Sequence, residues 1–226
     1  MHKVIVWDFP TRAFHWLLVA ALVFQYISGD ILDDAMQWHF YIGYFTLGLL
    51  IFRLAWGFVG HVYSRFGMFI RSPQATLSYL KGKDQQVYLT HNPAGALSVV
   101  ALLTLFLTQA VSGLFMTDDI FLEGPWYAAV DKEVADVASF LHGQVYIVLM
   151  ALALIHIVAV LYYQFKKKQA LVQSMVHGKK ESNREGHKPV KFNNLKALIV
   201  IAISILTVYL VVEVLPPPVD DSFYDY

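Results

Sequence analysis

Two histidines, His142 and His156, lie fourteen residues apart in one apolar stretch. Fourteen residues make nearly four turns of 3.6 residues, so both imidazoles would leave the same face of a helix. At 1.5 Å per residue they would lie about 21 Å apart along the axis, most of the way across a hydrocarbon core about 30 Å thick. Ionisable side chains are costly inside a membrane helix and usually mark a functional site. The spacing therefore predicts two bound groups, one above the other.

The composition is that of a membrane protein. Of the 226 residues, 57% are hydrophobic and only 15% are charged, and the mean hydropathy is +0.51. A soluble domain carries about a quarter charged residues. Cysteine is absent, which excludes disulfides, thiolate metal sites, iron–sulfur clusters and covalently attached c-type haem in this chain.

The apolar segments predict an all-α integral membrane bundle. Five segments are long enough to cross a bilayer: residues 13–28, 38–59, 95–115, 139–165 and 195–215. We expect four parts along the chain: a four-helix core at residues 1–180, a basic cytoplasmic linker at 181–194, a fifth transmembrane helix at 195–215 and an acidic outer tail at 216–226.

Charge segregation predicts the orientation of the chain. Sixteen of the seventeen Lys and Arg residues fall on one side of the predicted spans, and twelve of the seventeen Asp and Glu residues fall on the other, beside Lys132. Lys and Arg concentrate on the cytoplasmic side of membrane proteins. We therefore expect a cytoplasmic N-terminus and a periplasmic C-terminus. Because the basic residues line the membrane, no nucleic-acid partner is expected.

With this topology, four histidines fall into two pairs of matched depth. His39 and His142 lie near the outer ends of the second and fourth spans, and His15 and His156 lie toward the inner side of the first and fourth. Each pair draws its members from two different helices. Haem iron accepts axial histidines from both faces of the porphyrin, and helical bundles build such sites from facing side chains. The pattern predicts two haems, each held by two of these histidines.

Three alternatives to haem fit the four histidines less well. A single histidine in a span is often a hydrogen-bonding residue between helices, but four in two matched pairs favour haem. A zinc or non-haem iron site fits badly, because metal–imidazole bonds are short and the spans lack accompanying carboxylates. A haem-free transporter remains an alternative, although the repeats and broken helices typical of transporters are not apparent.

Further residues are candidates around these groups. Arg12 and Arg53 could pair with haem propionates, since a guanidinium binds a carboxylate through two parallel hydrogen bonds; they could equally be anchors at the cytoplasmic face. Gly43 lies one turn after His39 and would let a flat ring approach the helix. For a quinone site we expect the inner side of the membrane, with three candidate residues: His91, Asn92 and Arg71. Asn92 could instead simply begin the third span.

At these residues the chain resembles the bacterial di-haem cytochrome b family. That family includes cytochromes of the b-561 type, the b-type subunits of membrane-bound nickel–iron hydrogenases and the related subunit of formate dehydrogenase. The resemblance covers about residues 4–180 and rests on four stretches: WDFPTRAFHWLL, WHFYIGYFTLGLLIFRLAWGFVGHVYSRF, HNPAGALSVVALLTLFLTQAVSGLF and the run from His142 through His156 to ALVQSMVHGKK.

The resemblance implies a four-helix core with two b haems, one held by His39 and His142 and the other by His15 and His156. It implies electron transfer in a respiratory chain of the bacterial inner membrane, between the quinone pool and a periplasmic redox partner. Together with the acidic outer segments, it points to a c-type cytochrome or a hydrogenase-like subunit as that partner. The chain would then be the electron-transfer subunit of an oxidoreductase system. A stand-alone superoxide:quinone oxidoreductase is the alternative. The fifth span departs from the four-span pattern.

Overall fold

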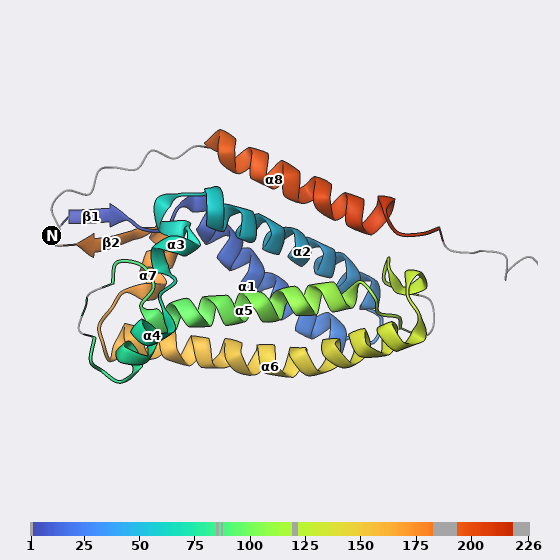
Figure 1. The fold of residues 1–226 in the computed structure, drawn as a ribbon, viewed down its shortest axis with the longest axis horizontal. Coiled ribbons are helices and arrows are strands. Elements are labelled where there is room, and N and C mark those ends of the chain that lie inside the picture. The colour runs from blue at the N-terminus through green and yellow to red at the C-terminus, as the bar shows by residue number, and fades with distance from the viewer. Residues whose placement is uncertain (1, 85, 87, 119–121, 183–193, 219–226) are drawn as a thin grey trace, which may run out of the picture.

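The computed structural model (Figure 1) describes the whole chain except residues 1, 85, 87, 119–121, 183–193 and 219–226. Five of its helices are long and apolar enough to cross a membrane, which confirms the predicted all-α membrane bundle. Their bounds are α1 (Phe9–Asp30), α2 (Met36–Val59), α5 (Pro93–Gly113), α6 (Lys132–Phe165) and α8 (Asn194–Tyr209), the last continued by a π-helical turn, η3 (Leu210–Val214).

Capping residues explain why three of these helices begin before the apolar segments that predicted them. The side chains of Asp8, Asn92 and Asp131 accept hydrogen bonds from the backbone three residues ahead, which satisfies amide groups that a helix start leaves unpaired. Pro10 and Pro93 occupy the first turns of α1 and α5, where proline costs no hydrogen bond. Polar first turns thus lengthen α1 and α6 beyond the predicted residues 13–28 and 139–165.

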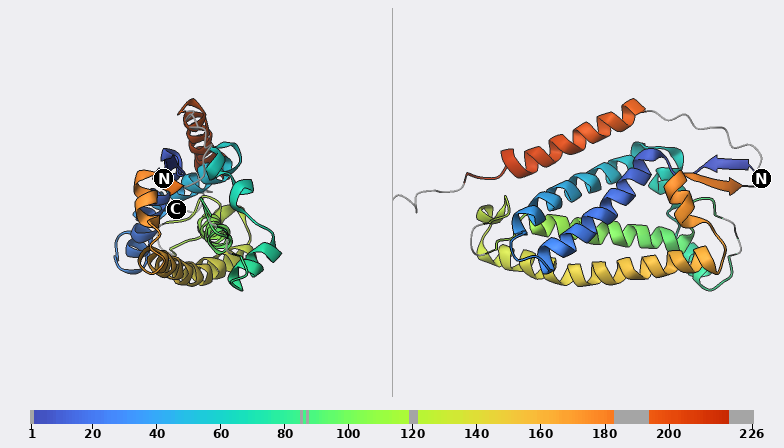
Figure 2. Two further views of the ribbon diagram at one scale, coloured as in Figure 1. Left: turned by 90° about the vertical axis from the view of Figure 1, so that its left-hand side faces the viewer. Right: turned by 180° about the vertical axis from the view of Figure 1, so that it is seen from behind.

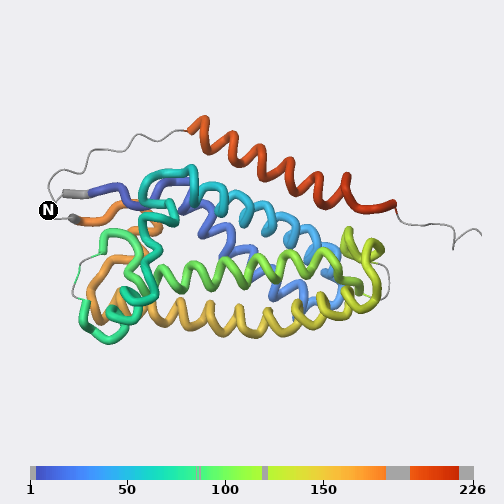
Figure 3. The backbone as a smooth tube through the Cα atoms, viewed as in Figure 1, coloured from blue at the N-terminus to red at the C-terminus, as the bar shows by residue number. Residues whose placement is uncertain are grey.

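The helices form two antiparallel pairs joined through α2. The first pair is α1 with α2, the second is α5 with α6, and α2 also contacts α5; Figure 3 follows the chain through both pairs. Between the four helices lies an apolar core. Members of this core come from every long helix and include Phe14, Leu50, Trp56, Phe106 and Leu149.

Small elements cover one end of the bundle. They are β1 (His2–Ile5), η1 (Val62–Ser64), α3 (Phe66–Phe69), α4 (Pro73–Leu80), α7 (Leu171–His177) and β2 (Lys179–Ser182). β1 and β2 pair antiparallel with Ile5 opposite Lys179, a sheet that the sequence did not predict. At the opposite end lies the short η2 (Tyr127–Ala129).

Charge divides the two ends. All described Lys and Arg residues except Lys132 lie in or beside the elements at the β1–β2 end, which we call the basic end. Opposite is the acidic end, where α1 finishes and α6 starts; its acidic residues include Asp30, Asp33, Asp34, Asp131, Glu133 and Asp136. Most of the predicted linker at 181–194 and of the predicted tail at 216–226 lies outside the described residues.

Helix α8 lies outside the four-helix arrangement. Among the other long helices it packs closely against α2 alone, and the end-on view in Figure 2 shows it standing out from the bundle. At its first turn, Lys196 Nζ donates to the carbonyl of Val59 at 3.4 Å. Near its other end, Trp126 Nε1 donates to the carbonyl of Val211 at 2.8 Å, in the π-helical turn. Each end of the helix is thus tied to the bundle.

Candidate functional site

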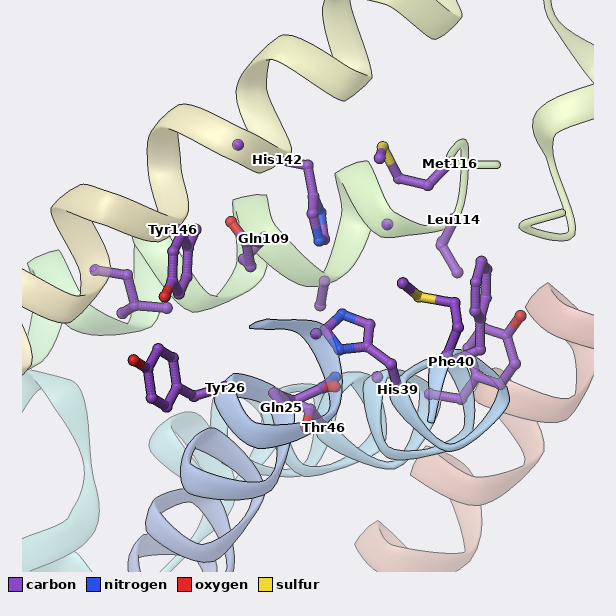
Figure 4. Close-up of a pocket in the computed structure, with 18 of the residues that line it drawn as sticks. Gln25, Tyr26, His39, Phe40, Thr46, Gln109, Leu114, Met116, His142 and Tyr146 are labelled. Carbon is purple, nitrogen blue, oxygen red and sulfur yellow. The ribbon is translucent and has the colours of Figure 1, made fainter. Parts of the chain in front are cut away.

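His39 and His142 face each other across a cavity at the acidic end of the bundle. Their ring centres lie 6.3 Å apart with an interplanar angle of 68°. Figure 4 shows the two imidazoles reaching toward one another, His39 from α2 and His142 from α6. The cavity measures about 300 Å³ and is lined by residues from α1, α2, α5 and α6. Two histidines far apart in the chain therefore share one internal site.

A serine hydroxyl holds the Nδ1 atom of each of these imidazoles. Ser28 Oγ lies 3.2 Å from His39 Nδ1 and 3.4 Å from the carbonyl of Gln25. When this hydroxyl donates to the carbonyl, it accepts from Nδ1–H, and the unprotonated Nε2 is then the nitrogen left to bind a metal. Ser28 thereby selects the tautomer that a ligand needs.

The same arrangement recurs on the second helix pair. Ser112 Oγ lies 3.0 Å from His142 Nδ1 and 3.1 Å from the carbonyl of Gln109. Both serines belong to the sequence Q-x-x-S-G, at residues 25–29 in α1 and 109–113 in α5. Each motif therefore positions the histidine of the helix paired with it. The sequence did not predict a role for these serines, although it contains the signal: a repeat that is only five residues long.

The glycine of each motif allows the imidazole to lie close to the backbone. A Cβ atom at Gly29 would lie 3.0 Å from both Cε1 and Nδ1 of His39. A Cβ atom at Gly113 would lie 3.1 Å from Cε1 of His142. Contacts this short force the neighbouring ring to move, so glycine is needed here for close approach.

The separation of the two rings fits one metal ion between them. A metal–imidazole bond is about 2.0 Å long and the imidazole centre lies about 1 Å behind its nitrogen, so two opposed ligands place their ring centres about 6 Å apart. The observed 6.3 Å agrees. Gln25 Oε1 and Gln109 Oε1 line the same cavity and are buried without a hydrogen-bond partner. Gly43 also lines it, where a Cβ atom would meet Gln25 Nε2 at 3.3 Å.

Tyr26 and Tyr146 stand beside this cavity (Figure 4). Their rings stack with centres 6.5 Å apart, and the hydroxyl of Tyr146 donates to the carboxylate of Asp30. Because Tyr26 and Asp30 belong to α1 and Tyr146 to α6, these contacts join two helices that are not among the closely packed pairs.

His15 lies on α1 and His156 on α6, both toward the basic end of the bundle. The ring of His15 lies edge-on to Trp16 with centres 5.0 Å apart. Its Nδ1 atom is buried and has no hydrogen-bond partner, a state that is costly unless another group binds the ring. His15 and His156 are therefore the candidate residues for a second site between α1 and α6.

Arg53 extends into this region from α2. It follows His39 by fourteen residues, as His156 follows His142, so it takes the corresponding position in the first helix pair. Its side chain is only 4% exposed, its guanidinium lies 4.7 Å from the ring centre of Phe66, and Nη1 has no hydrogen-bond partner. A buried cation with an unused donor is suited to an anionic group such as a propionate.

Arg12 has a different environment. Its Nη1 donates to the carbonyl of Val176 at 2.5 Å, while Nε is buried without a partner. Arg12 lines a groove that faces α8.

The three candidate quinone residues have separate environments. His91 packs between Trp7 and Phe69, with ring centres 4.9 and 4.6 Å away. Burial, followed by the nearby Arg53, lowers the pKa of His91 to about 3. Asn92 Oδ1 accepts from Gly95 N at 2.7 Å as the cap of α5, and Arg71 is exposed. Within the described part of the chain, none of the three lines the histidine cavity or the groove that faces α8.

The fold and this site define an integral membrane helical bundle that brings imidazoles together between its helices. A family model described as prokaryotic cytochrome b561 matches residues 6–178. The chain belongs to this family, whose members carry b-type haem and transfer electrons within the membrane. It is therefore a bacterial membrane protein. No curated protein matches the chain. The family match ends before α8.

Proposed function

We propose that this chain carries electrons across the bacterial cytoplasmic membrane through two b haems. His39 and His142 would hold the haem at the acidic end, and His15 and His156 the haem at the basic end. The observation that supports this most strongly is the 6.3 Å separation of the His39 and His142 rings, combined with a serine on the Nδ1 atom of each. Held by these residues, a haem would supply a one-electron couple.

The distance to be crossed explains why two sites are needed. A hydrocarbon core is about 30 Å thick, and the two histidines of α6 would divide that span at a separation of about 21 Å along the helix axis. α6 supplies one ligand to each site, so a single helix fixes both the distance and the relative orientation of the two sites. The apolar core between them keeps water away from the path.

Charged residues at the two ends support an orientation of the chain in the membrane and a type of redox partner. The basic end would face the cytoplasm and the acidic end the periplasm. Asp33, Asp34, Glu133 and Asp136 are exposed at the acidic end and would attract a basic redox partner, such as a c-type cytochrome, or a hydrogenase-like subunit. Quinone exchange would take place at the basic end, where His91, Asn92 and Arg71 remain the candidate residues.

The protein's own side chains would pair with the charged propionates of a bound haem. Nη1 of Arg53 is available for a propionate at the basic end.

Electron transfer in proteoliposomes tests this function. Purified chain is reconstituted with ferricyanide inside the vesicles, a quinol is added outside, and haem reduction and ferricyanide loss are followed by absorbance. The parent and His177→Ala, which changes an exposed histidine at the basic end, should both reduce the enclosed ferricyanide. His142→Ala and His156→Ala should each stop this transfer. Transfer that survives both substitutions would refute a path through the two pairs.

A further inference from the structure

A long groove runs between α8 and the four-helix part of the molecule. It has a volume of about 1410 Å³ and is lined by α1 on one side, α8 on the other and α2 between them. Most of its lining is apolar and includes Leu17, Phe52, Ile201, Ile205 and Val208. The end-on view in Figure 2 shows α8 standing away from the four-helix part of the molecule. In a bilayer such a groove opens to lipid.

The mouth of the groove at the basic end is cationic. Four basic side chains line it: Arg12, Arg65, Lys179 and Lys196. The first two donate to backbone carbonyls, Arg12 to Val176 and Arg65 to Gly60 at 2.9 Å. Because a carbonyl carries no net charge, these hydrogen bonds leave the positive charge uncompensated. Arg12 Nε is in addition buried without a partner.

Among the described residues, fewer carboxylates than basic side chains line the groove. Two carboxylates line the groove, Asp8 and Glu213. Glu213 lies in η3, at the opposite end of α8. Asp8 is fully buried and accepts hydrogen bonds from three donors: Thr11 N, Ser64 Oγ and Trp56 Nε1. The described side chains that line the groove at the basic end therefore carry more positive than negative charge.

We propose that this groove is a binding site for one anionic phospholipid. The lipid phosphate would lie among Arg12, Arg65, Lys179 and Lys196, and the acyl chains would lie along α2 between α1 and α8. A cluster of Lys and Arg beside a membrane helix attracts anionic lipid headgroups, and guanidinium groups bind phosphate oxygens through charge-assisted hydrogen bonds. A quinone head group carries no net charge, so its attraction to four cations would be weaker than that of a phosphate group. The proposed lipid site does not require a bound haem.

The bound lipid would also stabilise the position of α8 beside the four-helix core. Its tight contacts are with α2, where a Cβ atom at Gly48 would meet Val208 at 3.4 Å. A lipid in the groove fills the space between α8 and α1, which the two helices do not fill with contacts of their own. Dispersion contacts along acyl chains are weak singly and large together.

Native mass spectrometry of the full chain in detergent tests the proposal. The protein is titrated with dioleoyl phosphatidylglycerol and, separately, with dioleoyl phosphatidylcholine. We expect one tightly bound phosphatidylglycerol, with an affinity about tenfold or more above that of phosphatidylcholine. Lys179→Gln/Lys196→Gln should reduce this preference to near unity, and Ile205→Trp should weaken both lipids by filling the apolar part. The matched control, Lys166→Gln/Lys167→Gln, changes two lysines at the end of α6 and should keep the preference.

Three results would overturn the proposal: equal affinity of the parent for the two lipids, a preference that survives Lys179→Gln/Lys196→Gln, and a preference lost equally in the control. Millimolar inorganic phosphate provides a further arm. If phosphate alone displaces phosphatidylglycerol completely and Ile205→Trp has no effect, the mouth is a simple anion site and the groove holds no lipid.

Discussion

The Nδ1 atoms of His39 and His142 have matching partners, and this match determines what the imidazoles can do. Ser28 and Ser112 each lie within 3.2 Å of the Nδ1 atom that they hold. Outer partners of this kind set the tautomer and the ring orientation of a ligand, and their loss typically lowers metal affinity about 10- to 100-fold. The serines are therefore positioning residues for the proposed haem site.

Replacing Ser112 should loosen the haem at the acidic end while the other haem stays in place. For Ser112→Ala we expect haem affinity at that site to fall about 10- to 100-fold and its midpoint potential to shift, as measured by haem titration and redox potentiometry. Ser112→Thr keeps the hydroxyl and should restore both. Ser204→Ala removes a buried hydroxyl that donates to the carbonyl of Val200 within α8, and should match the parent.

A side chain at Gly29 should disturb the proposed haem at the acidic end. Gly29→Ala places a Cβ atom 3.0 Å from the ring of His39, so the ring must turn or shift away. The acidic-end haem should be lost or show an altered low-spin spectrum, recorded by electron paramagnetic resonance. Gly67→Ala is the control, because a Cβ atom there meets nothing within 4 Å. An unchanged spectrum in Gly29→Ala would argue against His39 as a ligand.

Asp8 joins the start of α1 to α2 and η1. Its carboxylate caps α1 through Thr11 N and accepts from Trp56 Nε1 at 2.8 Å and Ser64 Oγ at 3.1 Å. Buried donors that lose their acceptor are costly, at about 1–3 kcal/mol each. This single carboxylate therefore fixes how the first helix pair meets the small elements of the basic end.

Asp8→Ala should lower the free energy of unfolding by about 3 kcal/mol, since it removes a helix cap and leaves two buried donors unpaired. Denaturation in mixed micelles, followed by circular dichroism, measures this. Asp131→Ala is a matched control: Asp131 is exposed and caps α6 only through Val134 N at 3.0 Å, so its loss should cost about 1 kcal/mol. Equal losses in the two variants would show that the additional bonds of Asp8 contribute nothing.

The membrane-spanning helices were predictable from the sequence, whereas contacts between elements were not. Apolar runs specify membrane helices because the bilayer requires length and hydrophobicity, and a spacing of fourteen specifies a face. The hydrogen bond between Ser28 and His39 depends on how α1 and α2 are rotated relative to each other, and no hydropathy pattern encodes this rotation. The β1–β2 sheet was missed because two four-residue strands far apart in the chain give no local signal. The groove beside α8 likewise depends on where a helix outside the four-helix core docks.

For the whole molecule, the charge division predicts the orientation in the membrane. The chain has no cysteine, so single cysteines can be introduced without background and labelled with a membrane-impermeant maleimide. In intact spheroplasts, Glu133→Cys at the acidic end should react, and Lys167→Cys at the basic end should react only after permeabilisation. Both positions are exposed, which makes them comparable. The opposite labelling pattern would invert the predicted topology.

A haem count tests directly whether the two histidine pairs hold two haems. The parent, His142→Ala and His156→Ala are purified from cells with ample haem, and each is examined by a pyridine haemochrome assay and a reduced-minus-oxidised spectrum. We expect two b haems per parent chain and one in each variant, with different remaining spectra because different sites survive. No haem in the parent, or two haems retained in both variants, would contradict it.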